Sequence, residues 1–198
     1  KAMQRNWIGR SEGVEIEFRG MDENTGKEFS LPVFTTRPDT LYGVAAVVIA
    51  PEHPLVEALV TDEARGPVTA YVQAAARKSE LQRTGLDQEK TGVPLGIEVR
   101  HPLTGAHVPV WVADYVLANY GTGAVMVVPA HDDRDFTFAK TYSLPVKRVI
   151  APPAGAASAS EGAAYTASGI LIDSEEFSGL TTDDAKRKIA DHLESKGM

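Results

Sequence analysis

The sequence predicts a single α/β domain with a mixed, largely β core surrounded by helices. Three observations lead to this fold class. Strand-like and helix-like segments alternate along the 198 residues without a fixed-period repeat. A hydrophobic content of 43% is enough to bury a substantial core. The length suits one compact domain, so we expect residues 1–198 to form one unit.

The first part of the chain predicts a β-hairpin followed by a buried strand. Residues 14–18 alternate apolar and polar side chains, and residues 28–34 form a second extended run after a turn-like NTG at 24–26. Residues 44–50 are continuously apolar and rich in β-branched side chains, which is typical of a strand buried on both faces. We therefore expect the loop at 35–42 to be held at a strand edge.

Helices and further strands follow. Residues 54–60 and 67–78 have helical composition, each with a proline near the first turn, which favours a helix start. Further strands are expected at 97–99, 108–113 and 124–128.

The remaining segments indicate turns, one long loop and a closing helix. HPLTG at 101–105 has turn chemistry, so its His and Thr are interpreted as structural. Residues 151–168 are rich in Ala, Ser, Gly and Pro, which predicts a flexible surface loop. Residues 182–196 have the apolar spacing of an amphipathic helix. The KRK triplet at 186–188 is interpreted as its solvated face rather than an RNA-binding patch.

Composition excludes several kinds of chemistry. The chain has no cysteine, which removes disulfides, thiolate metal sites and thiol nucleophiles. A formal net charge of −7 argues against broad coverage of a nucleic-acid backbone, so any contact with RNA is expected to be local. No apolar stretch has membrane-spanning length, and residues 1–10 lack the apolar run of a signal peptide. We expect a soluble cytoplasmic protein.

The segment TTRPDT at 35–40 concentrates hydroxyl, guanidinium and carboxylate groups within six residues. Pro38 stiffens the backbone and biases Arg37 away from helical geometry. Such a loop suits an ester flanked by ribose hydroxyls and a phosphate, because hydroxyls and amides can stabilise an oxyanion. The residues alone leave a second interpretation open, in which Thr and Asp only satisfy a turn.

The segment HDDRD at 131–135 follows the predicted strand at 124–128 and opens a helix that runs to about Thr141. Asp132 and Asp135 have the spacing of an N-cap and an N3 residue, which explains one of them structurally. A carboxylate here can bind the α-ammonium of an aminoacyl group. A metal site of His131, Asp132 and Asp135 is a competing interpretation, but no second His/Asp cluster completes it, and we predict no metal.

TTRPDTLYG at 35–43 and GTGAVMVVPAHDDRD at 121–135 together resemble the editing domain of class I aminoacyl-tRNA synthetases for branched aliphatic amino acids. The similarity extends from about Asn6 to the final helix. Valyl enzymes tend to have TTRPET and isoleucyl enzymes a TTTPWT-like segment, whereas Asp39, Met126 and HDDRD match bacterial-type leucyl enzymes. The resemblance implies a barrel-like editing-domain fold and a larger parent synthetase.

The resemblance also implies roles for individual residues. The implied catalytic residues are Thr35, Thr36, Arg37, Asp132 and Asp135. The implied substrate-binding residues are Thr40, Met126, Val128, His131, Arg134, Tyr120 and Leu117. Residues 35–37 would contact the terminal adenosine and the ester, Thr40 would block leucine, and Asp135 would hold the α-ammonium. Leu117 and Tyr120 would lie near the adenosine, and Glu80 is a weaker candidate.

The implied function is post-transfer editing, the hydrolysis of isoleucyl, valyl, methionyl or norvalyl esters of leucine tRNA with leucine excluded. A separate hydrolytic site is useful because one methyl group in an apolar pocket is worth only about 1–3 kcal/mol. The implied partners are the 3′-terminal adenosine of that tRNA and the rest of the synthetase. The implied protein is a monomer without a cofactor.

Two alternatives remain open from the residues: a non-catalytic module that binds an aminoacyl-adenosine or an RNA 3′ end, and a metal-dependent hydrolase. The ATP-binding parent enzyme would contain HIGH-like and KMSKS-like segments, and this chain contains neither. We therefore expect no aminoacylation by this chain.

Overall fold

The computed structural model describes residues 13–22, 25–85, 89–153 and 162–198. Six strands form its main sheet: β1 (Val14–Met21), β2 (Glu28–Thr35), β3 (Ala46–Ile49), β4 (Gly92–Arg100), β5 (His107–Ala113) and β6 (Ala124–Val127). Their order is β2-β1-β4-β5-β3-β6. This mixed sheet, with the helices around it, confirms the predicted α/β fold.

The predicted hairpin is present as β1 and β2. Val14 lies opposite Thr35, and the pairing continues without a break to the turn. Ile16 and Phe18 are buried while the residues between and beyond them are more exposed, as period-two alternation requires. Asn24 of the predicted turn lies outside the described residues. The hairpin ends at Thr35, so the TTRPDT segment begins at the end of an edge strand.

β3 is the buried strand expected around residues 44–50. All four of its residues are buried. It pairs in parallel with β5 and antiparallel with β6, with Ala46 opposite Val127. The backbone N–H of Ala45 also donates to the Val127 carbonyl at 2.9 Å. The start of β3 and the end of β6 are therefore neighbours.

The expected loop at 35–42 is largely a 3₁₀-helix, η1 (Pro38–Gly43). Pro38 occupies the first position, where its fixed φ suits a helical turn and its missing N–H costs nothing. All six residues of η1 are buried. His101 confirms its structural interpretation here, because its Nε2 donates to the Leu41 carbonyl at 2.9 Å while its Nδ1 accepts from the turn after β4.

In the described residues, five α-helices and a second 3₁₀-helix surround the sheet: α2 (Pro54–Leu59), α3 (Asp62–Ala75), α4 (Glu80–Thr84), α5 (Asp133–Tyr142), α6 (Thr182–Ser195) and η2 (Glu175–Phe177). The predicted start of α3 at Pro67 is wrong. Asp62 and Glu63 begin the helix, because acidic side chains stabilise its first turn, and Pro67 lies inside it. The unpredicted α4 begins with a capping box of Ser79 and Gln82.

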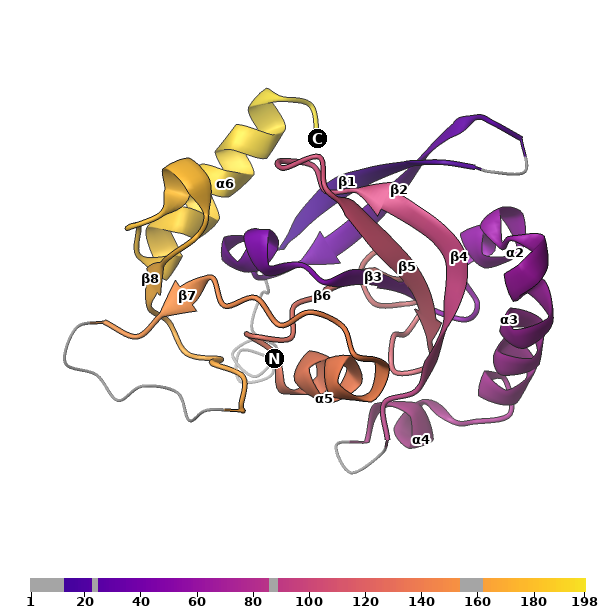
Figure 1. The fold of residues 1–198 in the computed structure, drawn as a ribbon. Coiled ribbons are helices and arrows are strands. Elements are labelled where there is room, and N and C mark those ends of the chain that lie inside the picture. Colours follow the sequence, from indigo (N-terminus) through magenta and orange to yellow (C-terminus); the bar gives the residue numbers. More distant parts are fainter. Residues whose placement is uncertain (1–12, 23–24, 86–88, 154–161) are drawn as a thin grey trace, which may run out of the picture.

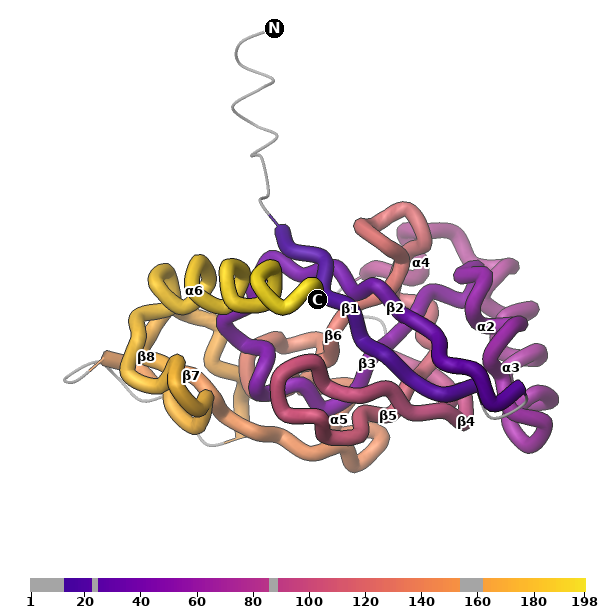
Figure 2. Tube along the Cα trace, turned by 90° about the horizontal axis from the view of Figure 1, so that it is seen from above, coloured from indigo at the N-terminus to yellow at the C-terminus, as the bar shows by residue number. Residues whose placement is uncertain are grey.

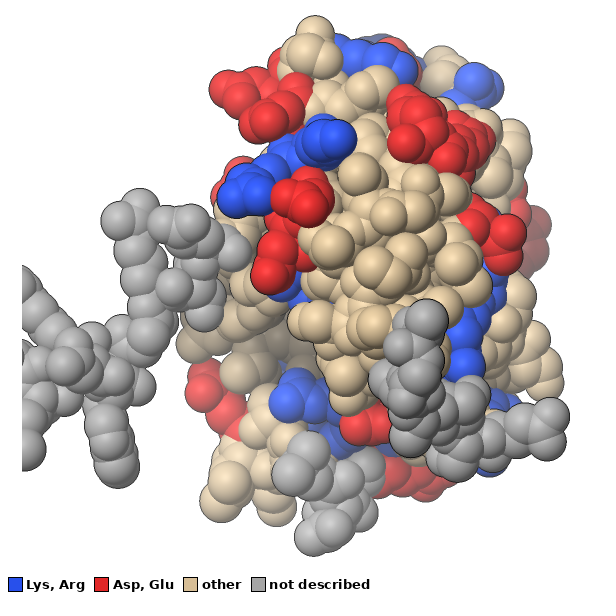
Figure 3. All heavy atoms as spheres, turned by 90° about the vertical axis from the view of Figure 1, so that its left-hand side faces the viewer, with Lys and Arg blue, Asp and Glu red and all other residues tan. Residues whose placement is uncertain are grey.

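Helices α2 and α3 lie at one end of the sheet and α6 lies at the other, as both views show (Figure 1, Figure 2). α6 packs on η1 through its apolar face, with Ala185, Ile189 and Leu193 buried as predicted. On the face that carries α6, basic and acidic side chains lie next to one another (Figure 3). Arg187 of the basic triplet is exposed there and pairs with Asp184.

The predicted loop at 151–168 lies between two short strands, β7 (Ile150–Ala151) and β8 (Ile170–Leu171), which pair with each other. Residues 154–161 of this loop lie outside the described residues. In the described part, the Tyr165 N–H donates to the Ala130 carbonyl at 2.8 Å. The end of this segment is thus attached to the turn between β6 and the HDDRD cluster.

The sheet curls until its two edge strands, β2 and β6, contact each other. No ladder joins these strands in the described part of the chain, so the term barrel-like fits loosely. The largest hydrophobic cluster fills the inside of this curve and includes side chains from β1 to β6. None of the described helices is long and apolar enough to cross a membrane.

Gly96 gives a test of the sheet geometry. It has φ of +90°, lies where the β4–β5 register shifts, and an added Cβ would collide with Thr61 at the start of α3. We expect Gly96→Ala to lower the free energy of unfolding by about 2–3 kcal/mol, from backbone strain plus overpacking. Urea unfolding measures this. Gly105→Ala is the control, because its φ is +70° in open space, and about 1 kcal/mol is expected. Equal decreases in the free energy of unfolding for Gly96→Ala and Gly105→Ala would show that the contact with Thr61 adds nothing.

Candidate active site

One cavity of about 330 Å³ lies where the two polar segments meet. Antiparallel pairing of β3 and β6 places residues 35–40, which precede β3, beside residues 128–135, which follow β6. All five predicted catalytic residues and all seven predicted substrate-binding residues line this cavity. The volume is within the range of small-molecule sites, about 300–1,000 Å³. The structure therefore brings the whole predicted set together.

Arg37 is held in place by its neighbour Asp39. The guanidinium donates from Nε to both carboxylate oxygens at 3.1 Å and from Nη2 to Oδ2 at 2.9 Å. Asp39 is fully buried, whereas the Arg37 side chain is 29% exposed. Its Nη1 also reaches the Thr166 carbonyl at 3.4 Å. This geometry orients one charged group at the cavity wall without leaving the buried carboxylate unpaired.

The three threonines of this segment differ in how their hydroxyls are used. Thr40 is buried, and its hydroxyl donates to the Arg37 carbonyl at 2.9 Å. The Thr35 hydroxyl oxygen accepts from the Arg37 N–H at 3.0 Å. The Thr36 hydroxyl makes no hydrogen bond to another described residue. Thr36 is therefore the hydroxyl most available to a ligand, and the polar group of Thr40 is already occupied.

Asp135 is the buried carboxyl group of the cavity. Its Oδ2 accepts from the Val128 N–H at 2.8 Å, and its Oδ1 accepts from the Tyr115 hydroxyl at 3.5 Å. Burial, with the negative charge of Asp132, raises the pKa of Asp135 to about 8. Burial also raises the pKa of Tyr115 well above its ordinary value, so this hydroxyl stays a donor. A bound cation would favour the ionised form of Asp135.

Asp132 and Arg134 lie at the exposed start of α5. Asp132 is the N-cap, and its Oδ1 accepts from the backbone N–H of Arg134 at 2.8 Å and of Asp135 at 3.2 Å. The capping prediction is confirmed. Arg134 is exposed, and its side chain makes no hydrogen bond or ion pair to another described residue. Its guanidinium adds positive charge to the cavity mouth.

His131 is committed to the backbone through both ring nitrogens. Nδ1 donates to the Tyr165 carbonyl at 2.8 Å, and Nε2 accepts from the N–H groups of Val149 and Ile150 at 3.0 and 3.2 Å. These partners define the neutral ring, and burial lowers the pKa of His131 further. This ring shapes the cavity but has no nitrogen left for a proton or a metal. Among the described residues, no group of three or more His, Asp or Glu is arranged to hold a metal.

Five lining residues were not identified from the sequence: Phe34, Thr84, Tyr115, Val116 and Val125. Phe34 packs edge-on against Tyr120, with ring centroids 5.6 Å apart, and Tyr120 is 51% exposed at the mouth. Nothing in the local pattern marks Tyr115 as a partner of Asp135, because the two are joined only by folding. Glu80 does not line the cavity; it contacts Asn119 instead.

The cavity combines three features that suit one class of ligand. Hydroxyls and a guanidinium lie on the η1 side, and a buried carboxyl lies at the start of α5. The apolar side chains of Met126, on β6, and of Val128, directly after it, form a third part of the lining. Fold and site thus define an α/β domain with a partly open cavity that combines a polar side, a buried carboxyl group and an apolar wall.

A family model described as "Leucyl-tRNA synthetase, editing domain" matches residues 5–194. The chain belongs to this family. The leucine–tRNA ligases of Prochlorococcus marinus (strain MIT 9303) and Clostridium perfringens (strain 13 / Type A) are each 49% identical to it over 197 residues. Both alignments cover 100% of this chain, but 22% and 23% of the relatives. The chain thus spans about a fifth of their length.

A solved structure agrees with the family. The crystal structure of the ternary complex of Agrobacterium radiobacter K84 agnB2 LeuRS, tRNA and LeuAMS is similar to this chain with a TM-score of 0.67 and 34% identity. The similarity covers 98% of this chain and 20% of that chain. The predicted family and the editing-domain fold are therefore confirmed.

The raised pKa of Asp135 predicts a specific pH dependence. The pKa of Asp135 is higher in the folded chain than in the unfolded chain, so the contribution of this group to stability is fully present below about pH 4. That contribution is lost as the pH rises to about 8, by no more than about 1.4 kcal/mol per pH unit. Asp135→Asn cannot ionise, yet it still accepts from Val128. We expect its stability relative to the unmodified chain to rise from pH 5 to 8 in urea unfolding. A constant difference would contradict the raised pKa.

Proposed function

We propose that this domain carries out post-transfer editing, hydrolysing the ester of leucine tRNA that carries a wrong amino acid. The observation that supports this most is the convergence of residues 35–40 and 128–135 on one cavity. The substrates we propose are isoleucyl, valyl, methionyl and norvalyl esters, and the partners are the 3′-terminal adenosine and the rest of the synthetase. We also propose that the protein acts as a monomer, as the family resemblance implies.

The amino-acid part of the substrate is proposed to bind on the β6 and α5 side. The α-ammonium would pair with Asp135, whose second oxygen keeps its bond from Val128. Binding of a cation lowers the pKa of this carboxyl, so substrate binding near neutral pH would release a proton. The amino-acid side chain would then lie against Met126 and Val128.

The ester part is proposed to lie on the η1 side. Water attacks the carbonyl carbon, the bond to the ribose oxygen breaks, and that oxygen takes a proton as the free amino acid leaves. The Thr36 hydroxyl and the Arg37 guanidinium are available to stabilise the oxyanion and the adjacent phosphate. His131 has no free nitrogen, so we propose that substrate ribose hydroxyls assist the water.

Leucine is proposed to be excluded by Thr40. Its hydroxyl is bound to the Arg37 carbonyl, and its buried position in η1 prevents it from moving aside. Isoleucine is as large as leucine, so the cavity would discriminate by the position of the branch. A methyl group held against the leucine γ-branch can do this by repulsion alone.

Release of labelled amino acid from mischarged leucine tRNA tests the function. We expect the full-length protein that contains this domain to release label from isoleucyl-tRNA and not from leucyl-tRNA. Retained label on bound tRNA would instead indicate the non-catalytic binding module. Activity that is lost in excess chelator would favour a metal-dependent hydrolase.

Thr40→Ala tests the leucine block. Removing the side chain opens the space for the γ-branch, so we expect the full-length protein to hydrolyse leucyl-tRNA at least about tenfold faster, which corresponds to about 1.4 kcal/mol. Thr40→Val is the control, because it keeps the branched shape without the hydroxyl and should still reject leucine. Leucyl-tRNA that is equally stable with Thr40→Ala would refute the steric role.

Asp135→Asn tests the ammonium site. The variant keeps an acceptor for Val128 but loses the negative charge, so we expect deacylation of isoleucyl-tRNA to fall by up to about 100-fold. Asp133→Ala is the matched control, because Asp133 is also in the first turn of α5 but is exposed and outside the cavity. Undiminished kcat/KM in Asp135→Asn, with a native circular dichroism spectrum, would exclude this role.

A further inference from the structure

One wall of the cavity lies in a segment without regular secondary structure. Tyr115, Val116 and Leu117 line the cavity and follow the end of β5. The backbone here turns on itself, with the Tyr120 N–H donating to the Leu117 carbonyl at 3.1 Å. No strand pairs with residues 114–117 in the described part of the chain. Side chains from elsewhere therefore determine where this wall lies.

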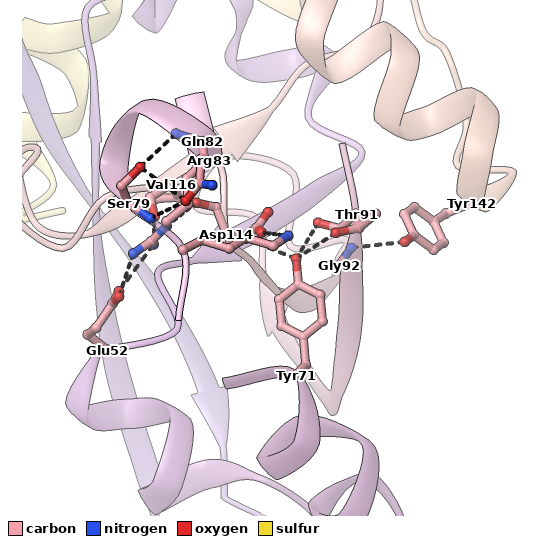
Figure 4. A network of polar contacts seen from close by, with 11 residues as sticks. Glu52, Tyr71, Ser79, Gln82, Arg83, Thr91, Gly92, Asp114, Val116 and Tyr142 are labelled. Atoms are coloured by element: carbon pink, nitrogen blue, oxygen red, sulfur yellow. Dashed lines mark hydrogen bonds and ion pairs between the residues drawn. The ribbon is translucent and has the colours of Figure 1, made fainter. Parts of the chain in front are cut away.

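A buried arginine supplies the main contacts to this wall. Arg83, on α4, donates from Nε to the Asp114 carbonyl at 2.6 Å and from Nη2 to the Val116 carbonyl at 2.9 Å. The same guanidinium forms a bidentate pair with Glu52, at 2.5 and 3.2 Å. The Arg83 side chain is only 6% exposed. Because the guanidinium is planar and rigid, these bonds hold the two carbonyls at fixed positions (Figure 4).

A second group of contacts meets the same backbone at Asp114. Its N–H donates to the Tyr71 hydroxyl at 3.1 Å, and that hydroxyl donates to the Thr91 carbonyl at 2.8 Å. The Asp114 carboxylate pairs with Lys78 at 2.6 Å. Figure 4 shows Tyr71 of α3 and Arg83 of α4 meeting this segment, while Glu52, in the turn after β3, binds Arg83. This second group holds Asp114, whereas, among the described residues, only Arg83 donates to the Val116 carbonyl.

We propose that Arg83 is a positioning residue for this site: it holds the wall at Tyr115–Leu117 in place without contacting substrate. Arg83 does not line the cavity, whereas Thr84, the next residue of α4, does. This inference rests on the proposed function, in which Leu117 and Tyr120 lie near the terminal adenosine. Arg37 is held by Asp39, and Asp135 accepts from the Val128 N–H at 2.8 Å, so each has a support that does not involve Arg83. A longer bond of 3.5 Å from the Tyr115 hydroxyl links Asp135 to the wall as well.

The proposal predicts a change in binding rather than in chemistry. Without Arg83 the wall near the adenosine loosens, while the groups proposed to act on the ester keep their positions. In the full-length protein, we expect Arg83→Met to raise KM for isoleucyl-tRNA about tenfold and to change kcat less than about threefold. Arg83→Lys should give a smaller rise in KM, because one ammonium group can reach one of the partners but cannot form the planar fork.

Two further variants separate this role from a general loss of stability. Arg65 is the matched control: it pairs with Asp62 at 3.2 Å and donates to the Val60 carbonyl at 3.4 Å, but it does not line the cavity. We expect Arg65→Met to leave KM unchanged. Glu52→Gln keeps a neutral hydrogen-bond partner for Arg83, so it should raise KM in the same direction but less, even where Arg83→Met fails to fold.

Hydrogen exchange of the full-length protein without substrate gives a readout independent of activity. We expect Arg83→Met to increase exchange of the backbone amides at 114–120 but not those of β3 or α5. If the unmodified protein does not release amino acid from isoleucyl-tRNA, the proposed function fails, while exchange still reports on the wall. Unchanged KM, unchanged exchange at 114–120, or increased exchange across the whole domain would overturn the proposal.

Discussion

The antiparallel pairing of β3 with β6 is the constraint on which the site depends. Ala46 lies opposite Val127, so the chain entering β3 and the chain leaving β6 are neighbours at one end of the sheet. Both strands are mostly apolar, and β3 is completely buried, so a slip of one residue would turn core side chains toward the wrong face. The hydrophobic register of two short strands therefore sets where the polar groups of residues 35–40 and 131–135 meet.

The polar groups around the cavity fall into two kinds, those that build it and those that stay free. His131 uses both ring nitrogens for backbone bonds, and Asp132 caps α5. The Thr36 hydroxyl and the Arg134 guanidinium have no such partner among the described residues. Asp135 belongs to both kinds, because one oxygen holds the end of β6 while the carboxyl as a whole can receive a cation. A general base is not evident among these groups, so the proposed hydrolysis would depend on positioning and on charge.

The walls of the cavity differ in the contacts that hold them in place. The η1 side is buried and tied to the core by His101, and the α5 side is tied to the sheet through Asp135. The wall at Tyr115–Leu117 has neither a ladder nor a helix, and a guanidinium on α4 takes their place. In the proposed function, the terminal adenosine would meet this third wall, whose position depends on Arg83 rather than on regular secondary structure.

Local sequence was enough for most of the framework. Alternation identified β1, the extended run after a turn identified β2, and the continuous apolar run identified β3. The Asp132 cap identified the start of α5. Each of these signals depends only on near neighbours in the chain. The start of α3 was misplaced for the same reason, since Pro67 looks like a helix start unless Asp62 and Glu63 are weighed against it.

The two polar motifs were likewise visible in the sequence, and the family resemblance connected them. The partners of those motifs were not visible. Tyr115 meets Asp135, Tyr165 meets His131 and Glu52 meets Arg83 across long stretches of chain. No short-range pattern encodes such pairs, because a hydrogen bond depends on where two backbones pass each other in space. Residue types were sufficient to indicate the chemistry, but only the curled sheet decided which groups remain free to carry it out.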